Sequence, residues 1–307
     1  MPDVTVVGSL VIDFVFQVQR QPKPGETLTA EAFGIFLGGK GFNQAVAARR
    51  AGASVAMIGR LGDDVFAPLF EQALDREGID RTGIRRSGDG TGVSSPIVDR
   101  GGQNTLIVAP RANLTLTAAD VDAAAPLIES ARVVVAQRET SPQSIRRTAE
   151  LARHAGVTVV WNAAPAGPAE PEMFLLTDIL VVNELEAEAF AGCRVDDELA
   201  IREAARRLQE RGPRTVIVTL GERGAFVRSG TREQRLAAFS VEAVDATGAG
   251  DAFVGALAAR LAEGAPLEDA ARFANAAGAL AVTTLGAEPS MPRRGEIDLL
   301  FRTSEPR

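Results

Sequence analysis

Two glycines and an aspartate stand close together in the segment 248–251, which reads Gly-Ala-Gly-Asp. Apolar residues then recur every four positions from 253 to 261, and this spacing predicts an amphipathic helix that begins at the glycines. The first amides of such a helix have no partner within it and carry the positive end of its dipole, so they can bind a phosphate. We therefore interpret Gly248, Ala249 and Gly250 as an anion cradle.

Asp251 follows this cradle directly, in a place where a carboxylate would compete with a bound anion. One explanation is structural, since an acid in the first helical turn gains about 0.3 to 1 kcal/mol from the helix dipole. The other is catalytic: Asp251 accepts the proton of a hydroxyl that attacks a phosphoryl group held by the same amides. Phosphoryl transfer gains most of its rate from alignment and charge stabilisation, so a weak but well-placed base suffices. The loop alone leaves both explanations open.

The composition excludes several other chemistries. The chain has 307 residues, of which 46% are hydrophobic, and can bury one large core or two small ones. A net charge of -7 without a block of Lys or Arg argues against nucleic acid or an anionic membrane as the main partner. The single histidine, His154, and the single cysteine, Cys193, cannot form a disulfide or a zinc site of the usual kind. We expect His154 to end a helix rather than to act as a base, which leaves carboxylates and backbone amides for the chemistry.

The sequence also indicates the cellular compartment in which the protein is expected. The chain enters a strand-like run directly after residues 1–3, so we expect no signal peptide. No apolar stretch reaches the roughly 18 residues that a membrane span requires. A single cysteine suits a reducing compartment, and we expect a cytoplasmic protein.

The elements that must position the cradle follow an α/β pattern. Short apolar runs predict strands at 4–7, 55–58, 133–136, 157–161, 179–182 and 215–219. Helical patterns occupy 65–77, 142–155, a segment from 185, and 199–209. Unbroken Val and Ile runs predict strands covered on both faces, and therefore a three-layer α/β/α sandwich around a mostly parallel sheet. In such sheets ligands bind beyond the carboxyl ends of the strands.

Other extended segments lie outside this alternation. They are 14–19, 27–36, 92–99 and 103–108, with a turn at 99–102 between the last two. They predict a small separate β-sheet. The segment 34–40 nearly spells a phosphate-binding P-loop, but Gly41 stands where a Ser or Thr is needed for magnesium, so we reject that interpretation.

Two signatures in this sequence resemble those of the PfkB carbohydrate kinases. The segment 244–255 resembles their C-terminal signature, and 38–45 together with 59–64 resembles their N-terminal signature, in the ribokinase-like form. The similarity extends from about residue 4 to about residue 300. The resemblance implies one ribokinase-like domain over 1–307, in which the small sheet, at about 14–36 and 90–108, is a lid over the sugar. It also implies transfer of phosphate from ATP to a small sugar, and a homodimer formed through the lid.

The resemblance further implies roles for individual residues. Those that match the sugar site are Asp13, Gly38, Gly39, Lys40, Asn43 and Glu139. Those that match the ATP and Mg²⁺ site are Asn183, Glu186, Thr219, Gly221, Gly224, Gly250 and Asn275. Those that match a K⁺ site are Asp245, Thr247, Ala281, Thr284, Gly286 and Ser290. Judged from the residues alone, structural explanations stay open for some of these positions. Asn183 and Glu186 would then cap a helix, Asn275 would be a polar residue on a helix face, and Lys40 would be a solvated lysine.

Two positions depart from the ribokinase pattern. Val11 stands where an Asn would contact the sugar, and Phe42 stands where a small Ala is usual, so the pocket is expected to be reshaped. A nucleoside kinase is a second hypothesis, in which Phe42 or Phe14 lines a slot for the base. A binding protein without catalysis is a third, which the intact Asp251 disfavours. A dinucleotide-dependent oxidoreductase is the weakest hypothesis, because no Gly-x-Gly-x-x-Gly follows Val7.

Overall fold

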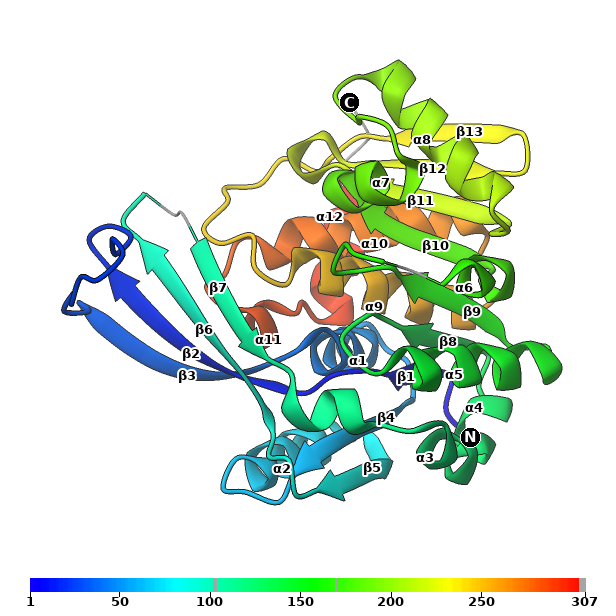
Figure 1. Ribbon diagram of the computed structural model, residues 1–307. Helices are drawn as coiled ribbons and strands as arrows, with labels where there is room; N and C mark the ends of the chain where they lie inside the picture. The colour runs from blue at the N-terminus through cyan, green and yellow to red at the C-terminus, as the bar shows by residue number, and fades with distance from the viewer. Residues whose placement is uncertain (102–103, 169, 304–307) are drawn as a thin grey trace.

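A mostly parallel β-sheet forms the centre of the protein (Figure 1). The structure is a computed structural model that describes residues 1–101, 104–168 and 170–303. Within them, the strands of this sheet are β1 (Val4–Val7), β4 (Val55–Gly62), β5 (Asp80–Ser87), β8 (Val133–Ala136), β9 (Thr158–Asn162), β10 (Ile179–Asn183), β11 (Thr215–Thr219), β12 (Ala225–Ser229) and β13 (Arg232–Leu236). Their order is β13-β12-β11-β10-β9-β8-β1-β4-β5, and the β11-β12 and β12-β13 pairs are antiparallel. The parallel strands therefore end at one edge, where ligands bind in such sheets.

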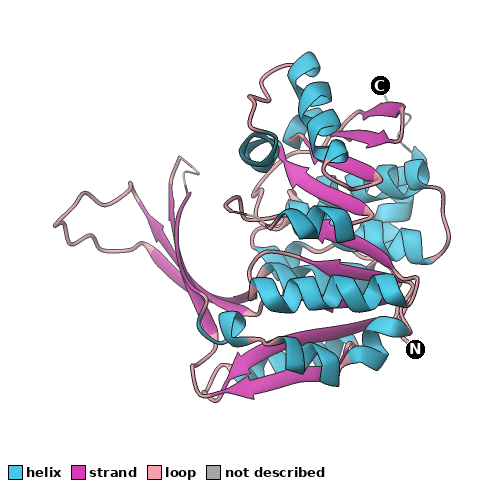
Figure 2. Ribbon diagram, turned by 45° about the vertical axis from the view of Figure 1, so that its right-hand side comes forward, coloured by secondary structure: helices cyan, strands magenta, loops and turns pink. Residues whose placement is uncertain are grey.

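Helices cover both faces of this sheet (Figure 2). One face carries α1 (Lys40–Arg50), α2 (Ala67–Glu77), α9 (Ala249–Ala262), α10 (Leu267–Ala281) and α12 (Arg294–Thr303). The other carries α3 (Ala118–Ala123), α4 (Ala125–Glu129), α5 (Pro142–His154), α6 (Pro171–Leu176), α7 (Glu184–Ala191) and α8 (Glu198–Glu210). In β1 the side chains alternate, with Val4 and Val6 in the first core and Val7 in the second. The predicted three-layer α/β/α sandwich is confirmed.

A smaller β-sheet extends away from the body of the protein (Figures 1 and 2). Its strands are β2 (Val11–Val18), β3 (Ala32–Gly38), β6 (Gly92–Asp99) and β7 (Asn104–Ala109), in the order β3-β2-β6-β7. We call it the lid sheet. Several of its apolar side chains, at the two edge strands, are between 44% and 67% exposed: Phe33, Ile35, Leu106, Ile107 and Val108. Such an exposed apolar surface is typical of an interaction site.

Most element boundaries agree with the sequence prediction to within two residues. The strand expected at 55–58 continues to Gly62. The strand expected from residue 27 begins at Ala32, and the one expected from residue 14 begins at Val11. The tail expected at 302–307 is helical at 302–303, because α12 continues to Thr303. Gly102 and Gln103, which belong to the expected turn and strand of the lid, lie outside the described residues. His154 is the last residue of α5, as expected.

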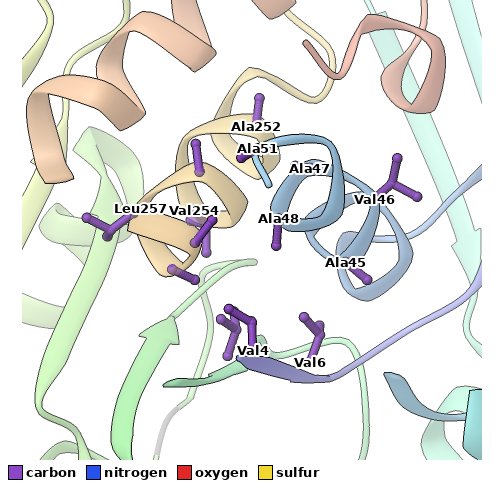
Figure 3. Packing of buried hydrophobic residues seen from close by; sticks show 14 of the residues in the cluster. Val4, Val6, Ala45, Val46, Ala47, Ala48, Ala51, Ala252, Val254 and Leu257 are labelled. Atoms are coloured by element: carbon purple, nitrogen blue, oxygen red, sulfur yellow. The ribbon is translucent and has the colours of Figure 1, made fainter. Parts of the chain in front are cut away.

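Helices α1 and α9 pack against each other above β1, so two segments far apart in sequence lie side by side (Figure 3). Small residues at the contact allow this close approach. A Cβ at Gly255 of α9 would lie 2.5 Å from Cβ of Ala47 and 2.7 Å from the carbonyl oxygen of Gln44, both on α1. Because no side chain intervenes, the start of α1 and the start of α9 are held at a fixed distance.

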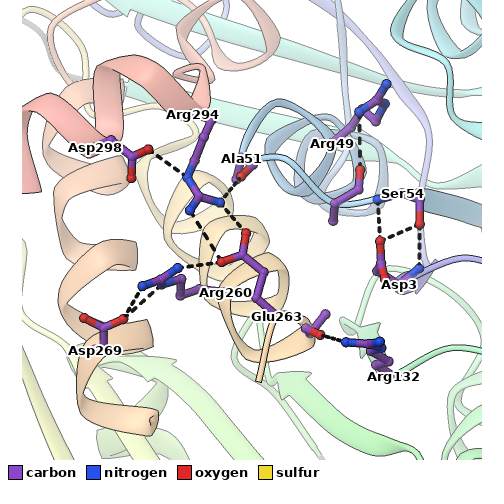
Figure 4. A network of polar contacts seen from close by, with 12 residues as sticks. Asp3, Arg49, Ala51, Ser54, Arg132, Arg260, Glu263, Asp269, Arg294 and Asp298 are labelled. Atoms are coloured by element: carbon purple, nitrogen blue, oxygen red, sulfur yellow. Dashed lines mark hydrogen bonds and ion pairs between the residues drawn. The ribbon is translucent and has the colours of Figure 1, made fainter. Parts of the chain in front are cut away.

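The C-terminal helix α12 is linked by polar contacts to the ends of α1 and α9 (Figure 4). The guanidinium of Arg294 donates to the carbonyl of Ala51 at 3.2 Å and to Asp298 at 3.0 Å, and it forms an ion pair with Glu263. Glu263 also accepts a hydrogen bond of 2.6 Å from Arg260. The network therefore links α12 to the C-terminal ends of α1 and α9.

None of the helices in the described part of the chain combines the length and the apolar character needed to cross a bilayer.

Candidate active site

The glycine loop and the first turn of α9 have the geometry of an open cradle. Gly248 is the N-cap in the left-handed region, with φ of 81°, and a Cβ there would lie 3.0 Å from Cα of Ala287. Gly250 is exposed, and a Cβ built on it would meet no atom within 4 Å. The helix backbone at Gly250 can therefore be approached closely by a ligand.

Asp251 lies in the first turn of α9 and is only 7% exposed, yet both of its carboxylate oxygens are hydrogen-bonded. Asn43 donates from Nδ2 to Oδ2 at 3.0 Å, and Gln44 donates from Nε2 to Oδ1 at 2.8 Å. Both donors belong to the first turns of α1. The α1–α9 contact therefore fixes the orientation of this carboxylate.

A cleft of about 210 Å³ opens beside Asp251. Its lining includes side chains and backbone from several elements: Lys40, Asn162, Asn183, Glu186, Thr219, Gly248, Gly250 and Asp251. Burial alone would lower the pKa of the Lys40 ammonium, but the surrounding carboxylates, of which Asp251 is the strongest, outweigh it, and the pKa is raised. Lys40 therefore stays charged at the mouth of the cradle, where it suits a phosphate group.

Asn183 and Glu186 form a capping box at the start of α7. Glu186 N donates to Oδ1 of Asn183 at 2.8 Å, and Asn183 N donates to Oε2 of Glu186 at 2.9 Å. Both residues also line the 210 Å³ cleft, and Glu186 is only 6% exposed. Burial raises the pKa of Glu186, against the hydrogen bond from Asn183 and the charge of Lys40. Asn183 and Glu186 can therefore cap α7 and contact a ligand in the cleft at the same time.

Asp13 lies in β2 of the lid sheet. Ser94 of β6 donates to its Oδ1, and a Cβ at Gly38 would lie 2.2 Å from its Oδ2. Burial, reinforced by the charges of Glu139 and Asp251 and opposed by the Ser94 hydrogen bond, raises the pKa of Asp13 to about 6.

Glu139 connects the end of β8 to the start of α1. Its Oε2 accepts a 2.5 Å hydrogen bond from Ser9 Oγ and a 2.9 Å bond from the Lys40 amide. Asn43 is 5% exposed, and its Oδ1 is buried without a hydrogen-bond partner among the described residues. A buried amide oxygen of this kind requires a donor, which a ligand hydroxyl can supply.

The other expected nucleotide residues are spread along the same side of the sheet. Thr219 ends β11 and lines the cleft, whereas Gly221, Gly224 and Asn275 are not part of its lining. Gly221 begins a single 3-10 turn and Gly224 follows its end, with φ of 54° and 85°. Asn275 donates from Nδ2 to the carbonyl of Ala237 at 2.7 Å, so it fixes the segment after β13 on α10.

The residues expected to bind a monovalent cation divide into two groups. Asp245 accepts from the Thr247 amide at 2.9 Å and from the Gly286 amide at 2.9 Å, and these hydrogen bonds lower its pKa against the effect of burial. Thr284 and Ser290 instead line a cavity of about 350 Å³. Ala281 accepts at its carbonyl from the Thr284 amide at 3.3 Å.

The two aromatic residues suggested for a base-binding slot lie in different places. Phe42 is 0% exposed and packs edge-on against Phe70 with ring centroids 5.2 Å apart, so it belongs to the core. Phe14 contacts Phe33 and Phe66 at the base of the lid sheet. The expectation that Phe42 reshapes the pocket was wrong, because the residue points from α1 toward α2 and not toward Asp251.

Sequence reasoning missed several residues that the structure brings to the site. Gln44 and Gln137 were not identified, nor were Ser9 and Ser94. A signal was available for Gln44, which with Asn43 is one of two polar residues in the otherwise apolar segment 42–48 of a buried helix. Gln137 directly follows β8, and therefore lies at the edge of the sheet where ligands bind.

Comparison with known proteins agrees with this geometry. The sequence model described as pfkB family carbohydrate kinase matches residues 1–294. The chain is 39% identical to a ribokinase of Haemophilus influenzae, over 95% of this chain and 96% of that protein, and 36% identical to a deoxyribokinase of Salmonella typhi, over 94% and 95%. The structure of Arabidopsis thaliana ribokinase complexed with ribose and ATP has a TM-score of 0.91, 30% identity and 99% coverage of both chains. The chain thus belongs to the PfkB family of carbohydrate kinases.

Proposed function

We propose that this carbohydrate kinase transfers the γ-phosphate of ATP to a primary hydroxyl of ribose or of a closely related small sugar. The observation that carries the proposal is the hydrogen bond of 3.0 Å between Asn43 and Asp251. It joins a residue that suits sugar hydroxyls to a carboxylate that borders the open cradle at Gly250. A hydroxyl bound at Asn43 would therefore reach both a base and a phosphoryl group.

Each residue then has a distinct task. Asp251 accepts the proton of the attacking hydroxyl, and the backbone of Gly248, Ala249 and Gly250 stabilises the charge of the transferred phosphoryl group. Asp13, Glu139 and the backbone of Gly38 and Gly39 hold the sugar. The charged Lys40 balances the phosphates at the cleft.

The cleft also suits a magnesium-bound nucleotide. The buried carboxylate of Glu186 and the side chain of Asn183 are oxygen ligands of the kind that Mg²⁺ prefers, directly or through water. When bound, the ion would neutralise charge on the phosphates. We propose that the part of the nucleotide beyond its phosphates contacts Thr219, Gly221, Gly224 and Asn275.

A monovalent cation is proposed at the loop that leads to the cradle. Asp245, Thr247 and Gly286 are already joined there by hydrogen bonds, and backbone carbonyls and hydroxyls suit K⁺. Of the other residues that the sequence assigned to the cation, Thr284 and Ser290 line the cavity of about 350 Å³, and the carbonyl of Ala281 accepts from the Thr284 amide. A cation at this position would strengthen the field that stabilises transferred charge.

The residue at position 11 favours a second substrate with one hydroxyl fewer. Val11 is 5% exposed and offers no polar group, so a hydroxyl facing it would lose a partner. The 36% identity to a deoxyribokinase supports 2-deoxyribose as this candidate. The burial of Phe42 removes one of the two aromatic residues, Phe42 and Phe14, on which the nucleoside hypothesis rested.

We also propose that the chain is one kinase domain whose lid sheet covers the sugar and pairs with the lid of a second copy. The exposed apolar side chains of β3 and β7 support such pairing, since a monomer would leave them in water.

The experiment that tests the function is an ADP-release assay with Mg-ATP and a panel of acceptors. The panel is ribose, 2-deoxyribose, fructose, 2-keto-3-deoxygluconate, adenosine and cytidine, each with and without K⁺. We expect the highest kcat/KM with one of the two pentoses, and a lower rate without K⁺. If ligands raise the melting temperature but no acceptor yields ADP, the chain is a binding protein and the proposal fails.

A further inference from the structure

Gln44 lies at the centre of a chain of buried carboxamides that ends on Asp251. Gln44 is 0% exposed, Gln137 1% and Asn162 7%. Gln137 Nε2 donates to Gln44 Oε1 at 2.7 Å, and Gln44 Nε2 donates both to Asp251 Oδ1 at 2.8 Å and to Asn162 Oδ1 at 3.0 Å. The three side chains come from α1, from the end of β8 and from the end of β9. We call them the amide chain.

One backbone carbonyl determines the direction of every amide in this chain. Asn162 Nδ2 donates to the carbonyl of Val181 at 3.1 Å, and a carbonyl can only accept. Asn162 therefore turns its Oδ1 toward Gln44, and because this oxygen accepts, Gln44 must donate to it from Nε2. The same Nε2 then faces Asp251, and Oε1 of Gln44 is left to accept from Gln137. Reversing any member would put two acceptors or two donors together.

The directions of these amides also determine how the Asp251 carboxylate is hydrogen-bonded. With Gln44 on Oδ1 and Asn43 on Oδ2, each oxygen of Asp251 receives an N–H donor and keeps a lone pair for another partner. Neither neighbour can accept a proton from Asp251. A proton that the carboxylate takes up can therefore come only from the open side, where the cleft lies.

Burying three carboxamides is costly unless they are hydrogen-bonded, and the hydrogen bonds of Gln44 are made to the other two carboxamides and to Asp251. Beside Gln44 in α1, Phe42, Ala45 and Val46 are apolar and each 0% exposed, whereas the other buried polar residue, Asn43, also donates to Asp251. We propose that Gln44 is a positioning residue, which holds the Asp251 carboxylate in the orientation required for proton transfer, and that Gln137 acts only through Gln44. This rests on the proposed sugar kinase activity.

The test is a set of Gln→Met substitutions, which keep the length of the side chain and remove its hydrogen bonds. Gln44→Met, Gln137→Met and the double variant are compared with Gln209→Met as the matched control. Gln209 also donates to a carbonyl, that of Arg214, and accepts from Arg228, but it lies at the end of α8, away from the cleft. The assay uses the acceptor that the wild-type chain phosphorylates.

We expect Gln44→Met to lower kcat by about 10²-fold, because a misplaced catalytic group costs about that factor, with KM for sugar and ATP within about threefold of wild type. Gln137→Met should lower kcat less, by about tenfold, and the double variant should be no slower than Gln44→Met alone. Gln209→Met should match the wild type.

Three results would overturn the inference. They are an unchanged kcat in Gln44→Met, a loss confined to KM, or effects of Gln44→Met and Gln137→Met that multiply in the double variant. Melting temperatures identify any variant that fails to fold, and Gln44→Leu, which is shorter, then replaces Gln44→Met. If the wild-type chain itself releases no ADP with any acceptor, the proposed function has failed instead.

Discussion

Asn43 and Asp251 are 208 positions apart in sequence, and their side chains meet at 3.0 Å where α1 and α9 begin. The first residue is expected to bind the acceptor sugar and the second to take its proton. The close α1–α9 packing at Gly255 is what makes the contact possible, because a side chain there would separate the helices. Substrate binding and proton transfer therefore depend on the same helix pair.

Asp251→Asn should abolish turnover while sugar binding persists. An amide cannot accept the proton, so we expect kcat to fall by about 10²- to 10⁴-fold. Both oxygens of Asp251 accept N–H donors, so the new NH₂ group must face Asn43 or Gln44 and destabilise the site. Asp251→Ala, which adds no donor, is the companion variant. Sugar binding is measured by calorimetry, and a kcat within tenfold of wild type in both variants would remove Asp251 from the mechanism.

Asp13 should link sugar affinity to pH. Its pKa is raised to about 6, so between about pH 4 and 6 the folded protein binds a proton that the unfolded chain has released. The stability that this carboxyl contributes to the ligand-free protein is therefore present at low pH and is lost as pH rises through 6. The sugar requires the ionised form as acceptor, so KM for sugar should rise as pH falls below about 6.

Asp13→Asn should remove both the pH dependence of stability and the pH dependence of KM for sugar that this carboxyl causes. The variant should be more stable than the wild type above pH 6, by roughly 1 to 3 kcal/mol, because the buried charge is gone. Its KM for sugar should rise by at least about 10²-fold. Urea unfolding at pH 5 and pH 8 and initial rates across the same range are the measurements. A KM near that of the wild type would place the sugar elsewhere.

The two glycines of the cradle should respond differently to alanine. Gly248→Ala forces a Cβ into a left-handed residue 3.0 Å from Ala287, so it should destabilise the fold by about 1 to 3 kcal/mol. Gly250→Ala meets no protein atom within 4 Å and should keep the melting temperature. Its methyl group would occupy the space proposed for phosphate, so KM for ATP should rise and kcat should fall. Wild-type kinetics in Gly250→Ala would rule out the cradle.

The lid sheet should control the oligomeric state. Ile107 is 67% exposed on the edge strand β7, and Ile107→Glu would place a charge in the proposed lid-to-lid contact. We expect a dimer for the wild type and a monomer for this variant in analytical ultracentrifugation. Val65→Glu is the control, since Val65 is 79% exposed but lies outside the lid. A monomeric wild type, or a dimeric Ile107→Glu, would contradict the proposal.

Phe42→Ala should affect stability and not specificity. Phe42 is 0% exposed against Phe70, so its loss should cost about 3 to 5 kcal/mol of unfolding free energy. The order of acceptors in the substrate panel should remain that of the wild type. If that order changes at a temperature where the variant is folded, Phe42 does influence substrate specificity and the prediction is wrong.

The sequence by itself determined the layers of the fold, and it led to the residues that we propose for the site. Unbroken apolar runs such as 133–136 and 215–219 are confirmed as strands with the same bounds, since a strand buried on both faces leaves little alternative. The polar strands β5 and β13 and the short helices α3 and α4 had no such pattern and were not predicted. The glycine loop led us to propose the cradle, and Gly248 adopts a left-handed φ of 81°, which glycine favours.

Only the tertiary structure decided which side chains meet. The sequence could not indicate that Gln44 and Gln137 point inward toward Asp251, or that Phe42 points away from it, because helix periodicity gives a face and not a partner. Those contacts depend on the distance between α1 and α9, which is set by small residues on both helices and by the sheet beneath them. The direction of each carboxamide was then determined by a carbonyl of β10, more than a hundred residues from Gln44.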